Sequence, residues 1–169
     1  MEHSPLRVAI VGQGRSGYDI HVARLRNDSR FRIVAVADFE KARREQSARE
    51  LGCKTYRTHA EMLRRTDAEL VIVSSYSFSH APIACQALEA GKHVLVEKPI
   101  AMNTRWVDRM IRARDQSGKC LFPFHNYRYT KEYLHLKEMI ASGILGDVFE
   151  IRMRALAFSR RNDWQTTRL

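Results

Sequence analysis

The sequence predicts an α/β fold with a doubly wound, mostly parallel sheet, and two observations carry this prediction. Short, nearly continuous apolar runs recur along the chain with helix-like segments between them. Such runs are typical of parallel strands that are covered on both faces. The first run, Val8–Val11, leads at once into a glycine-rich turn at residues 12–17. Strands and helices that alternate in this way indicate a doubly wound domain.

The expected strands are short apolar segments, each followed by a change to polar or glycine-rich sequence. They are Val8–Val11, Ile33–Ala37, Leu70–Val73, Val94–Val96 and Leu121–Phe124, with a short strand near Lys54–Tyr56 at the edge.

The segments between the strands carry helix signals. Apolar residues recur at helical spacing, as in Tyr18, Val22 and Leu25. Pro82 suits a first helical turn, and Gly91 is placed to end the same helix. We expect a further helix after a cap at residue 103 or 104 and a last one that ends at residue 143.

The glycine turn has the spacing Gly12-x-Gly14-x-x-Gly17, directly after a strand and at the start of a helix. Gly12 can adopt the positive φ of a sharp turn, Gly14 lets a pyrophosphate approach the main chain, and Gly17 lets the helix pack close to the strand. Backbone N–H groups at the helix start attract phosphate charge. The sequence therefore predicts a dinucleotide-binding Rossmann fold.

Asp38 follows the second expected strand, about 20 residues after the last glycine. An acidic residue at this point bonds the ribose hydroxyls of the adenosine in such folds. The alternative is that Asp38 only caps the next helix. The order of strand, glycines, helix and acid favours the ribose role and NAD as the cofactor, with NADP left open.

Composition and charge narrow the classes of function. The chain has 169 residues, of which 44% are hydrophobic and 28% charged, and its formal net charge is +10. The basic residues are scattered as doublets without an aromatic stripe, which favours attraction of an anionic cofactor or substrate over nucleic-acid binding. No segment approaches the roughly 20 apolar residues of a membrane span, and we expect no signal peptide. Three widely spaced cysteines suggest neither disulfides nor a metal site, so we expect a cytoplasmic protein.

The hydrophobic period changes near the end of the chain. Phe149, Ile151, Met153 and Ala155 alternate with polar residues, as in a half-buried antiparallel strand. We expect a first domain over residues 1–125, and a crossover helix with the first strand of a truncated α+β second domain over residues 126–169. One strand cannot form a sheet, so its apolar face must pair with another chain, fold back, or belong to a protein truncated here, and we expect homo-oligomer formation through residues 147–158.

Glu97-Lys98-Pro99 follows an expected strand and so lies at the edge of the sheet where ligands bind. A lysine there can place an ammonium group beside a substrate oxygen or transfer a proton. The alternative is a surface lysine in a turn. Position alone leaves both open.

Taken together, three segments make the chain resemble the glucose–fructose oxidoreductase/inositol dehydrogenase (Gfo/Idh/MocA) family. They are the glycine turn, residues 80–101 with Glu97-Lys98-Pro99, and residues 126–152. The resemblance implies an NAD(P)-dependent dehydrogenase that transfers hydride between nicotinamide and the carbinol carbon of a sugar, cyclitol or related polyol.

The resemblance also implies roles for individual residues. Lys98 would be the catalytic or substrate-orienting lysine, and Glu97 would support the site near the nicotinamide. Arg128 is a candidate substrate contact, with a solvated arginine as the alternative. The implied cofactor contacts are Gly12, Gln13, Gly14, Arg15, Ser16, Gly17, Asp38, Ser75, His80, Glu97 and Lys98.

Two departures from the family pattern are visible. Ser77 stands where the family has an asparagine, three residues before His80, and a hydroxyl lacks the paired donor and acceptor of an amide. The family's substrate domain, with its catalytic aspartate and histidine, lies beyond the 169 residues of this chain. The alternative function is therefore a non-enzymatic dinucleotide-binding module, a sensor or a partner subunit.

Overall fold

The computed structural model describes residues 4–154, 156 and 158. The chain divides into two compact units, Met1–His125 and Asn126–Leu169, and each is described separately. None of the helices in the described part of the chain is long and apolar enough to cross a membrane.

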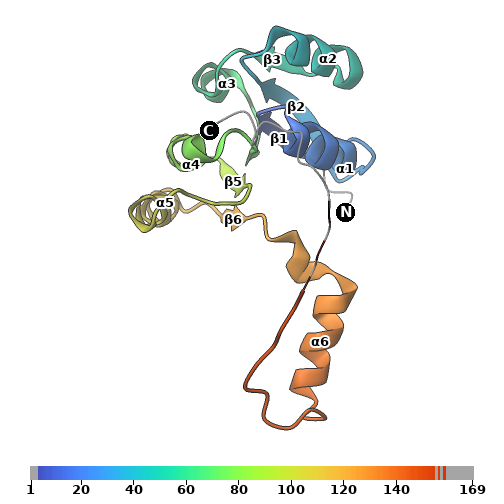
Figure 1. Ribbon diagram of the computed structural model, residues 1–169. Coiled ribbons are helices and arrows are strands. Elements are labelled where there is room, and N and C mark those ends of the chain that lie inside the picture. Colours follow the sequence, from blue (N-terminus) through green and yellow to red (C-terminus); the bar gives the residue numbers. More distant parts are fainter. Residues whose placement is uncertain (1–3, 155, 157, 159–169) are drawn as a thin grey trace. The chain divides into compact units, whose positions relative to one another are not determined.

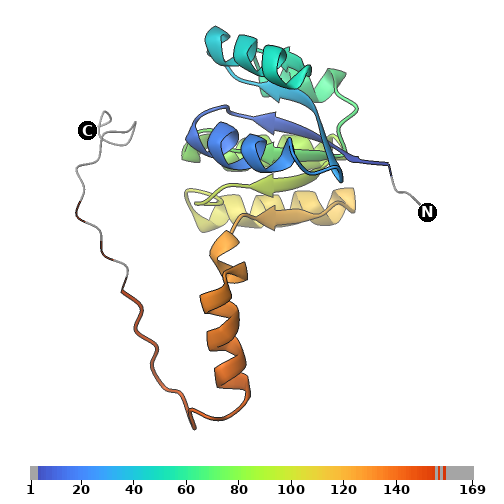
Figure 2. The same ribbon diagram turned by 90° about the vertical axis from the view of Figure 1, so that its right-hand side faces the viewer.

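The first unit is built on a six-stranded sheet in the order β3-β2-β1-β4-β5-β6 (Figure 1). All neighbouring strands run parallel (Figure 2). The strands are β1 (Leu6–Val11), β2 (Phe31–Ala37), β3 (Lys54–Tyr56), β4 (Leu70–Val73), β5 (His93–Val96) and β6 (Leu121–Pro123). The prediction of a doubly wound parallel sheet is confirmed, and the strand order reverses between β1 and β4.

Helical segments connect the strands of this unit. They are η1 (Ser16–Val22), α1 (Ala23–Leu25), α2 (Lys41–Leu51), α3 (His59–Arg65), η2 (Ser77–Ser79), α4 (His80–Glu89) and α5 (Thr104–Ser117). The expected cap of α5 is present, because the Asn103 side chain accepts a hydrogen bond from the backbone N–H of Trp106 at 3.1 Å. The first helix differs from expectation in one respect, since η1 is π-helical before the chain continues as α1.

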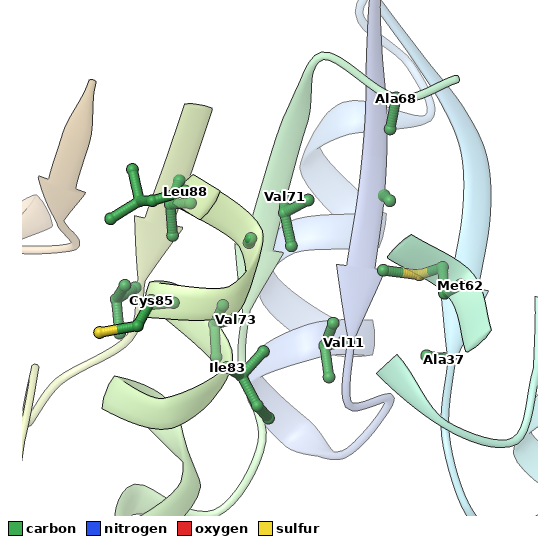
Figure 3. Packing of buried hydrophobic residues seen from close by; sticks show 14 of the residues in the cluster. Val11, Ala37, Met62, Ala68, Val71, Val73, Ile83, Cys85 and Leu88 are labelled. Atoms are coloured by element: carbon green, nitrogen blue, oxygen red, sulfur yellow. The ribbon is translucent and has the colours of Figure 1, made fainter. Parts of the chain in front are cut away.

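Two apolar cores lie on the two faces of the sheet. The larger one packs α3, α4 and α5 on the strands, and Ile83 of α4 lies beside Val73 of β4 (Figure 3). The smaller one packs Val22 and Leu25 on β1 and β2. Both cores pack against the strands themselves, so they support the loops that follow the carboxyl ends of these strands.

The second unit contains η3 (Asn126–Tyr129) and α6 (Lys131–Ala141). The side chain of Thr130 caps α6 by accepting a hydrogen bond from the backbone N–H of Tyr133 at 3.3 Å. After Ala141 the chain turns at Gly143, whose φ is +73°. The predicted last helix and its end signal are therefore both present.

No strand is present within residues 149–154 of the single chain, so the strand expected after α6 stays a prediction. The alternating apolar side chains are exposed instead, Phe149 at 97% and Met153 at 81%. The physical reason is that a strand needs a neighbour for its backbone hydrogen bonds, and these residues have no paired strand. Ala155, the last member of the expected strand, lies outside the described residues.

Candidate dinucleotide site

The glycine turn joins β1 to η1, and two of its glycines are required by the fold itself. Gly12 has a φ of +90°, and a Cβ there would lie 2.7 Å from the carbonyl oxygen of Ser74. A Cβ on Gly17 would lie 1.9 Å from the carbonyl oxygen of Gly12. Both contacts are shorter than any side chain tolerates, so these two positions need glycine for the chain to fold.

Gly14 is different, because its missing side chain leaves open space. A Cβ there would meet nothing closer than the Arg43 guanidinium, at 3.9 Å. Gly14 thus exposes main chain at the start of the helix, beside a cation. This geometry fits a pyrophosphate, which approaches bare backbone at a helix start in Rossmann folds. Arg15, which is exposed, and Ser16, the first residue of η1, complete the turn.

Asp38 is tied directly to the glycine turn. Its Oδ2 accepts a hydrogen bond from the backbone N–H of Gln13 at 2.7 Å, and its Oδ1 accepts one from the backbone N–H of Glu40 at 2.8 Å. Each carboxylate oxygen can accept a further bond, such as one from a ribose hydroxyl. The structure therefore brings Asp38 to the turn, and the capping role and the ribose role are compatible.

Gln13 is fixed by a second contact. Its side chain is buried and accepts a hydrogen bond from the Ser47 hydroxyl of α2 at 3.2 Å, and its amide nitrogen donates to the Gly12 carbonyl at 3.2 Å. The turn, β2 and α2 therefore form one hydrogen-bonded unit.

Arg43 adds a positive charge at the same place. Its guanidinium lies 3.7 Å from Asp38 Oδ2 and 3.3 Å from Glu40 Oε2. The neighbouring Arg44 is used differently, since it donates to the backbone carbonyls of Asp38 and Phe39 at 2.8 and 2.9 Å. Arg43 is thus the cation that faces both the open side of Gly14 and the Asp38 carboxylate.

An aromatic row, formed by Phe39, Tyr76 and Phe78, lies over the loops that follow β2 and β4. The ring centroids of Phe39 and Tyr76 are 6.1 Å apart, and those of Tyr76 and Phe78 are 5.8 Å apart in stacked orientation. Phe39 and Phe78 are 57% and 59% exposed. Contiguous exposed apolar surface of this kind is typical of ligand-binding and interaction sites.

The loop after β4 holds Ser75, Ser77 and His80. The Ser75 hydroxyl is 2.8 Å from the Ser79 hydroxyl, and Ser77 begins the turn η2. His80 is buried, and its Nδ1 and Nε2 lie 2.8 Å from the Pro99 carbonyl and 2.9 Å from the Ser75 carbonyl. His80 therefore links the ends of β4 and β5, and its direct contact with a cofactor stays a prediction.

Glu97 directly follows β5 and is buried against η1. Its Oε1 lies 2.9 Å from Nε2 of His21, and its Oε2 accepts a hydrogen bond from the backbone N–H of Lys98 at 3.2 Å. Burial acts to raise the pKa of the Glu97 carboxyl, but the hydrogen bond and charge of His21, with help from Lys98, outweigh it and hold that pKa below its ordinary value.

Lys98 itself is exposed at the carboxyl edge of the sheet, and the Lys98–Pro99 peptide bond is cis. The structure thus places Glu97 and Lys98 on the same edge as the glycine turn and Asp38. Arg128 lies in η3 of the second unit, with its guanidinium 5.9 Å from the centre of the Tyr133 ring. The catalytic role of Lys98 and the substrate role of Arg128 stay predictions.

Several residues of this region were missed by sequence reasoning. His21 lies three residues after Tyr18, on the apolar face of the first helix, so a polar residue on a buried face was the available signal. The aromatic row and the Arg43 contact join loops far apart in sequence, and no local pattern indicates them. No cluster of three metal-binding side chains occurs among the described residues.

Comparison with known proteins agrees with this geometry. Residues 6–125 match the model of a family described as "Oxidoreductase family, NAD-binding Rossmann fold". An inositol 2-dehydrogenase from Salmonella typhimurium is 34% identical over 95% of this chain and 49% of its own length. A D-glucoside 3-dehydrogenase from Escherichia coli is 32% identical over 92% of this chain and 45% of its own length.

A solved structure shows the same fold. The crystal structure of scyllo-inositol dehydrogenase from Lactobacillus casei, with bound NAD(H) and scyllo-inositol, superimposes with a TM-score of 0.80. It is 25% identical, and the match covers 85% of this chain and 43% of that one. The chain thus spans about half the length of the curated relatives it matches.

Proposed function

Because the chain belongs to the Gfo/Idh/MocA oxidoreductase family, as its motifs predicted, we propose that it is the nucleotide-binding part of an NAD(P)-dependent dehydrogenase. The substrate class is a sugar, cyclitol or related polyol. Relatives named for inositol and glucoside oxidation support this class. The residues 126–169 are then the beginning of the substrate domain.

The observation that carries the proposal is the contrast among the three glycines. Gly12 and Gly17 are enclosed by backbone, whereas Gly14 opens toward Arg43. Folding alone explains the first two glycines and gives no reason for the third. A ligand that needs bare main chain beside a cation gives one, and a pyrophosphate has that chemistry.

The two halves of the dinucleotide lie on opposite sides of β1 in this proposal. Asp38 and Arg43 hold the adenosine ribose at the end of β2, and the aromatic row offers ring faces to the base. Glu97 and Lys98, at the end of β5, lie on the nicotinamide side. Nicotinamide supplies the hydride chemistry when it is bound, and the protein binds, orients and polarises.

Lys98 acts on the substrate oxygen in this arrangement. Its ammonium group is exposed, and its backbone is fixed through Glu97. An ammonium group beside a carbinol oxygen stabilises the negative charge that develops there and transfers a proton. Arg128, in the second unit, is a separate candidate for a substrate contact.

The second candidate function is a non-enzymatic dinucleotide-binding module, which would need only the contacts gathered at the glycine turn and Asp38. We also infer homo-oligomer formation through residues 147–158, because Phe149 and Phe158 are fully exposed in the single chain. Residues 155 and 157 of that segment lie outside the described part. Three free thiols support a reducing, cytoplasmic location.

NADH fluorescence and a turnover assay together test the proposal. We expect NADH emission to change on binding to the chain and NAD to reverse the change by competition. The same protein is then given NAD and a panel of inositols and sugars, and NADH formation is followed. Turnover that disappears in Lys98→Met would show a complete active site in this chain and reject the module alternative. Absence of any dinucleotide binding would contradict the proposed function.

A further inference from the structure

The Lys98 turn is anchored on both sides by buried histidines that come from different helices. Before Lys98, the Glu97 carboxylate meets His21 of η1 at 2.9 Å. After Lys98, the Pro99 carbonyl meets Nδ1 of His80 of α4 at 2.8 Å. The backbone of Lys98 is therefore held between two fixed points, and its side chain is exposed to solvent.

The contact between His21 and Glu97, which we call the His21 anchor, is buried. The side chains of His21 and Glu97 are each 6% exposed. The ring of Phe124, just after β6, lies edge-on to the His21 ring with centroids 4.7 Å apart. Both Glu97 oxygens are used, one by His21 and one by the Lys98 backbone N–H. The carboxylate thus transmits the position of η1 to the backbone of Lys98.

The His80 anchor joins two loops in the same way. Its second nitrogen, Nε2, lies 2.9 Å from the Ser75 carbonyl. The ring is 2% exposed and spans from the end of β4 to the turn after β5. His80 therefore connects the Lys98 turn to the loop after β4, which carries Tyr76 and Phe78 of the aromatic row.

Stability alone does not account for the His21–Glu97 pair. Replacing a buried ionic pair by apolar side chains of similar volume is often neutral or stabilising, because desolvation of the charges is costly. The His21–Glu97 pair differs from apolar packing because it forms a directional contact between Nε2 of His21 and Oε1 of Glu97. That direction matters where a turn must be placed accurately against a bound ligand.

We propose that His21 and His80 are positioning residues that fix the Lys98 turn relative to the glycine turn. Binding of the nicotinamide half of the dinucleotide therefore depends on these histidines. Binding of the adenosine half does not. His21 lies in the helix that the glycine turn opens, so one contact connects the pyrophosphate side to the Lys98 turn. Asp38 lies on the other side of β1 and has no contact with either histidine. The inference rests on the proposed function.

The test compares two ligands that differ in the nicotinamide ring. NADH carries it, and ADP-ribose keeps the adenosine and pyrophosphate without it. The double variant His21→Leu/Glu97→Met removes the pair without leaving a buried charge. We expect its affinity for NADH to fall about tenfold and its affinity for ADP-ribose to stay within about twofold of wild type.

A conservative variant and a control complete the comparison. His21→Gln keeps an N–H donor near Glu97, so we expect it to retain most NADH affinity. His59→Leu removes another histidine contact, to Gln86 at 3.0 Å, and should change neither affinity. Equal losses for both ligands, or no loss for NADH, would overturn the inference. A wild-type chain that binds neither ligand would instead reject the proposed function and the inference with it.

Hydrogen exchange gives a second readout that needs no variant. NADH should slow amide exchange in residues 16–25 and 97–100 more than ADP-ribose does. The reason is that the His21–Glu97 contact transmits nicotinamide contacts at the Lys98 turn to η1. Extra protection confined to residues 97–100 would show that the two segments are not coupled and would also overturn the inference.

Discussion

The backbone N–H of Gln13 donates a 2.7 Å hydrogen bond to the carboxylate of Asp38. This bond joins the glycine turn after β1 to the end of β2, across 25 residues of sequence. Both groups are buried, so the acid is placed by the scaffold before any ligand arrives. The site is therefore largely formed in the single chain, which makes its parts testable one at a time.

Gly17 and Gly14 should respond differently to replacement by alanine. Gly17→Ala places a Cβ 1.9 Å from the Gly12 carbonyl, and we expect the domain to lose its cooperative thermal unfolding transition. Gly14→Ala adds a Cβ in open space and should leave the melting temperature within about 2 °C of wild type. Thermal unfolding followed by circular dichroism distinguishes the two. Equal destabilisation by both variants would show that Gly14 is also a packing glycine.

The choice between NAD and NADP should depend on Arg43. We expect wild type to prefer NAD, because Asp38 repels a 2′-phosphate. Arg43 lies 3.7 Å from Asp38 and offsets part of this repulsion. Arg43→Ala should weaken the binding of both cofactors, because Arg43 also faces Gly14, but it should weaken NADP binding roughly tenfold more than NAD binding, a difference of about 1.4 kcal/mol. Calorimetric titrations with both cofactors measure the ratio.

Arg65→Ala is the matched control for that measurement. Arg65 also forms a helical ion pair, with Glu61 at 3.2 Å, but it lies in α3 and has no contact with Asp38 or the glycine turn. Equal losses of NAD and NADP affinity in Arg43→Ala would mean that this arginine serves the pyrophosphate alone and does not offset the repulsion of a 2′-phosphate.

Acid should destabilise the wild-type domain more than Glu97→Gln. The pKa of Glu97 is lower in the folded chain than its ordinary value of 4.5. Protonation of Glu97 is therefore less favourable in the folded state than in the unfolded state. The contribution of the Glu97 carboxylate to the free energy of unfolding is fully present above its ordinary pKa, and it is lost as the pH falls through the lowered pKa of the folded state. Melting temperatures from neutral pH to about pH 3 should fall more steeply in wild type than in Glu97→Gln.

An exposed carboxylate serves as the control for this pH series. Glu45 pairs with Lys41 on the surface of α2 at 3.4 Å, and Glu45→Gln should follow the wild-type curve because exposed pairs contribute little. Parallel curves for wild type and Glu97→Gln would contradict the account of the buried pair.

Much of the fold could be predicted from the sequence because its signals are local. Continuous apolar runs located every strand of the sheet except the short edge strand β3, and the Asn103 cap and the Gly143 end signal were found from a few neighbouring residues. The expected strand at residues 149–154 is not formed in the single chain, because periodicity indicates a preferred face but supplies no pairing partner.

The site was predicted less completely than the fold. The glycine spacing and Asp38 have a known local order, so they were recognisable. The His21–Glu97 contact joins residues 76 positions apart, and the aromatic row joins the ends of two strands that flank β1. Such contacts depend on the order of strands in the sheet, which the sequence pattern does not specify residue by residue.

The exposed end of the chain should cause self-association. Phe149, Ile151 and Met153 present apolar side chains to solvent, and an uncovered extended segment pairs readily with another chain. Sedimentation velocity should show concentration-dependent dimers or larger species. Replacing all three residues with serine should give a monomer at every concentration. A wild-type chain that stays monomeric would reject association through residues 147–158.

The central claim is that the open backbone at Gly14 binds the pyrophosphate of a nicotinamide dinucleotide. Calorimetric titration of NADH into the wild-type chain and into Gly14→Val tests it most directly. We predict saturable binding at one site per wild-type chain, and no detectable binding to a Gly14→Val variant that keeps the wild-type unfolding transition. Wild-type affinity in Gly14→Val would show that the glycine turn is only a structural feature and would contradict the account.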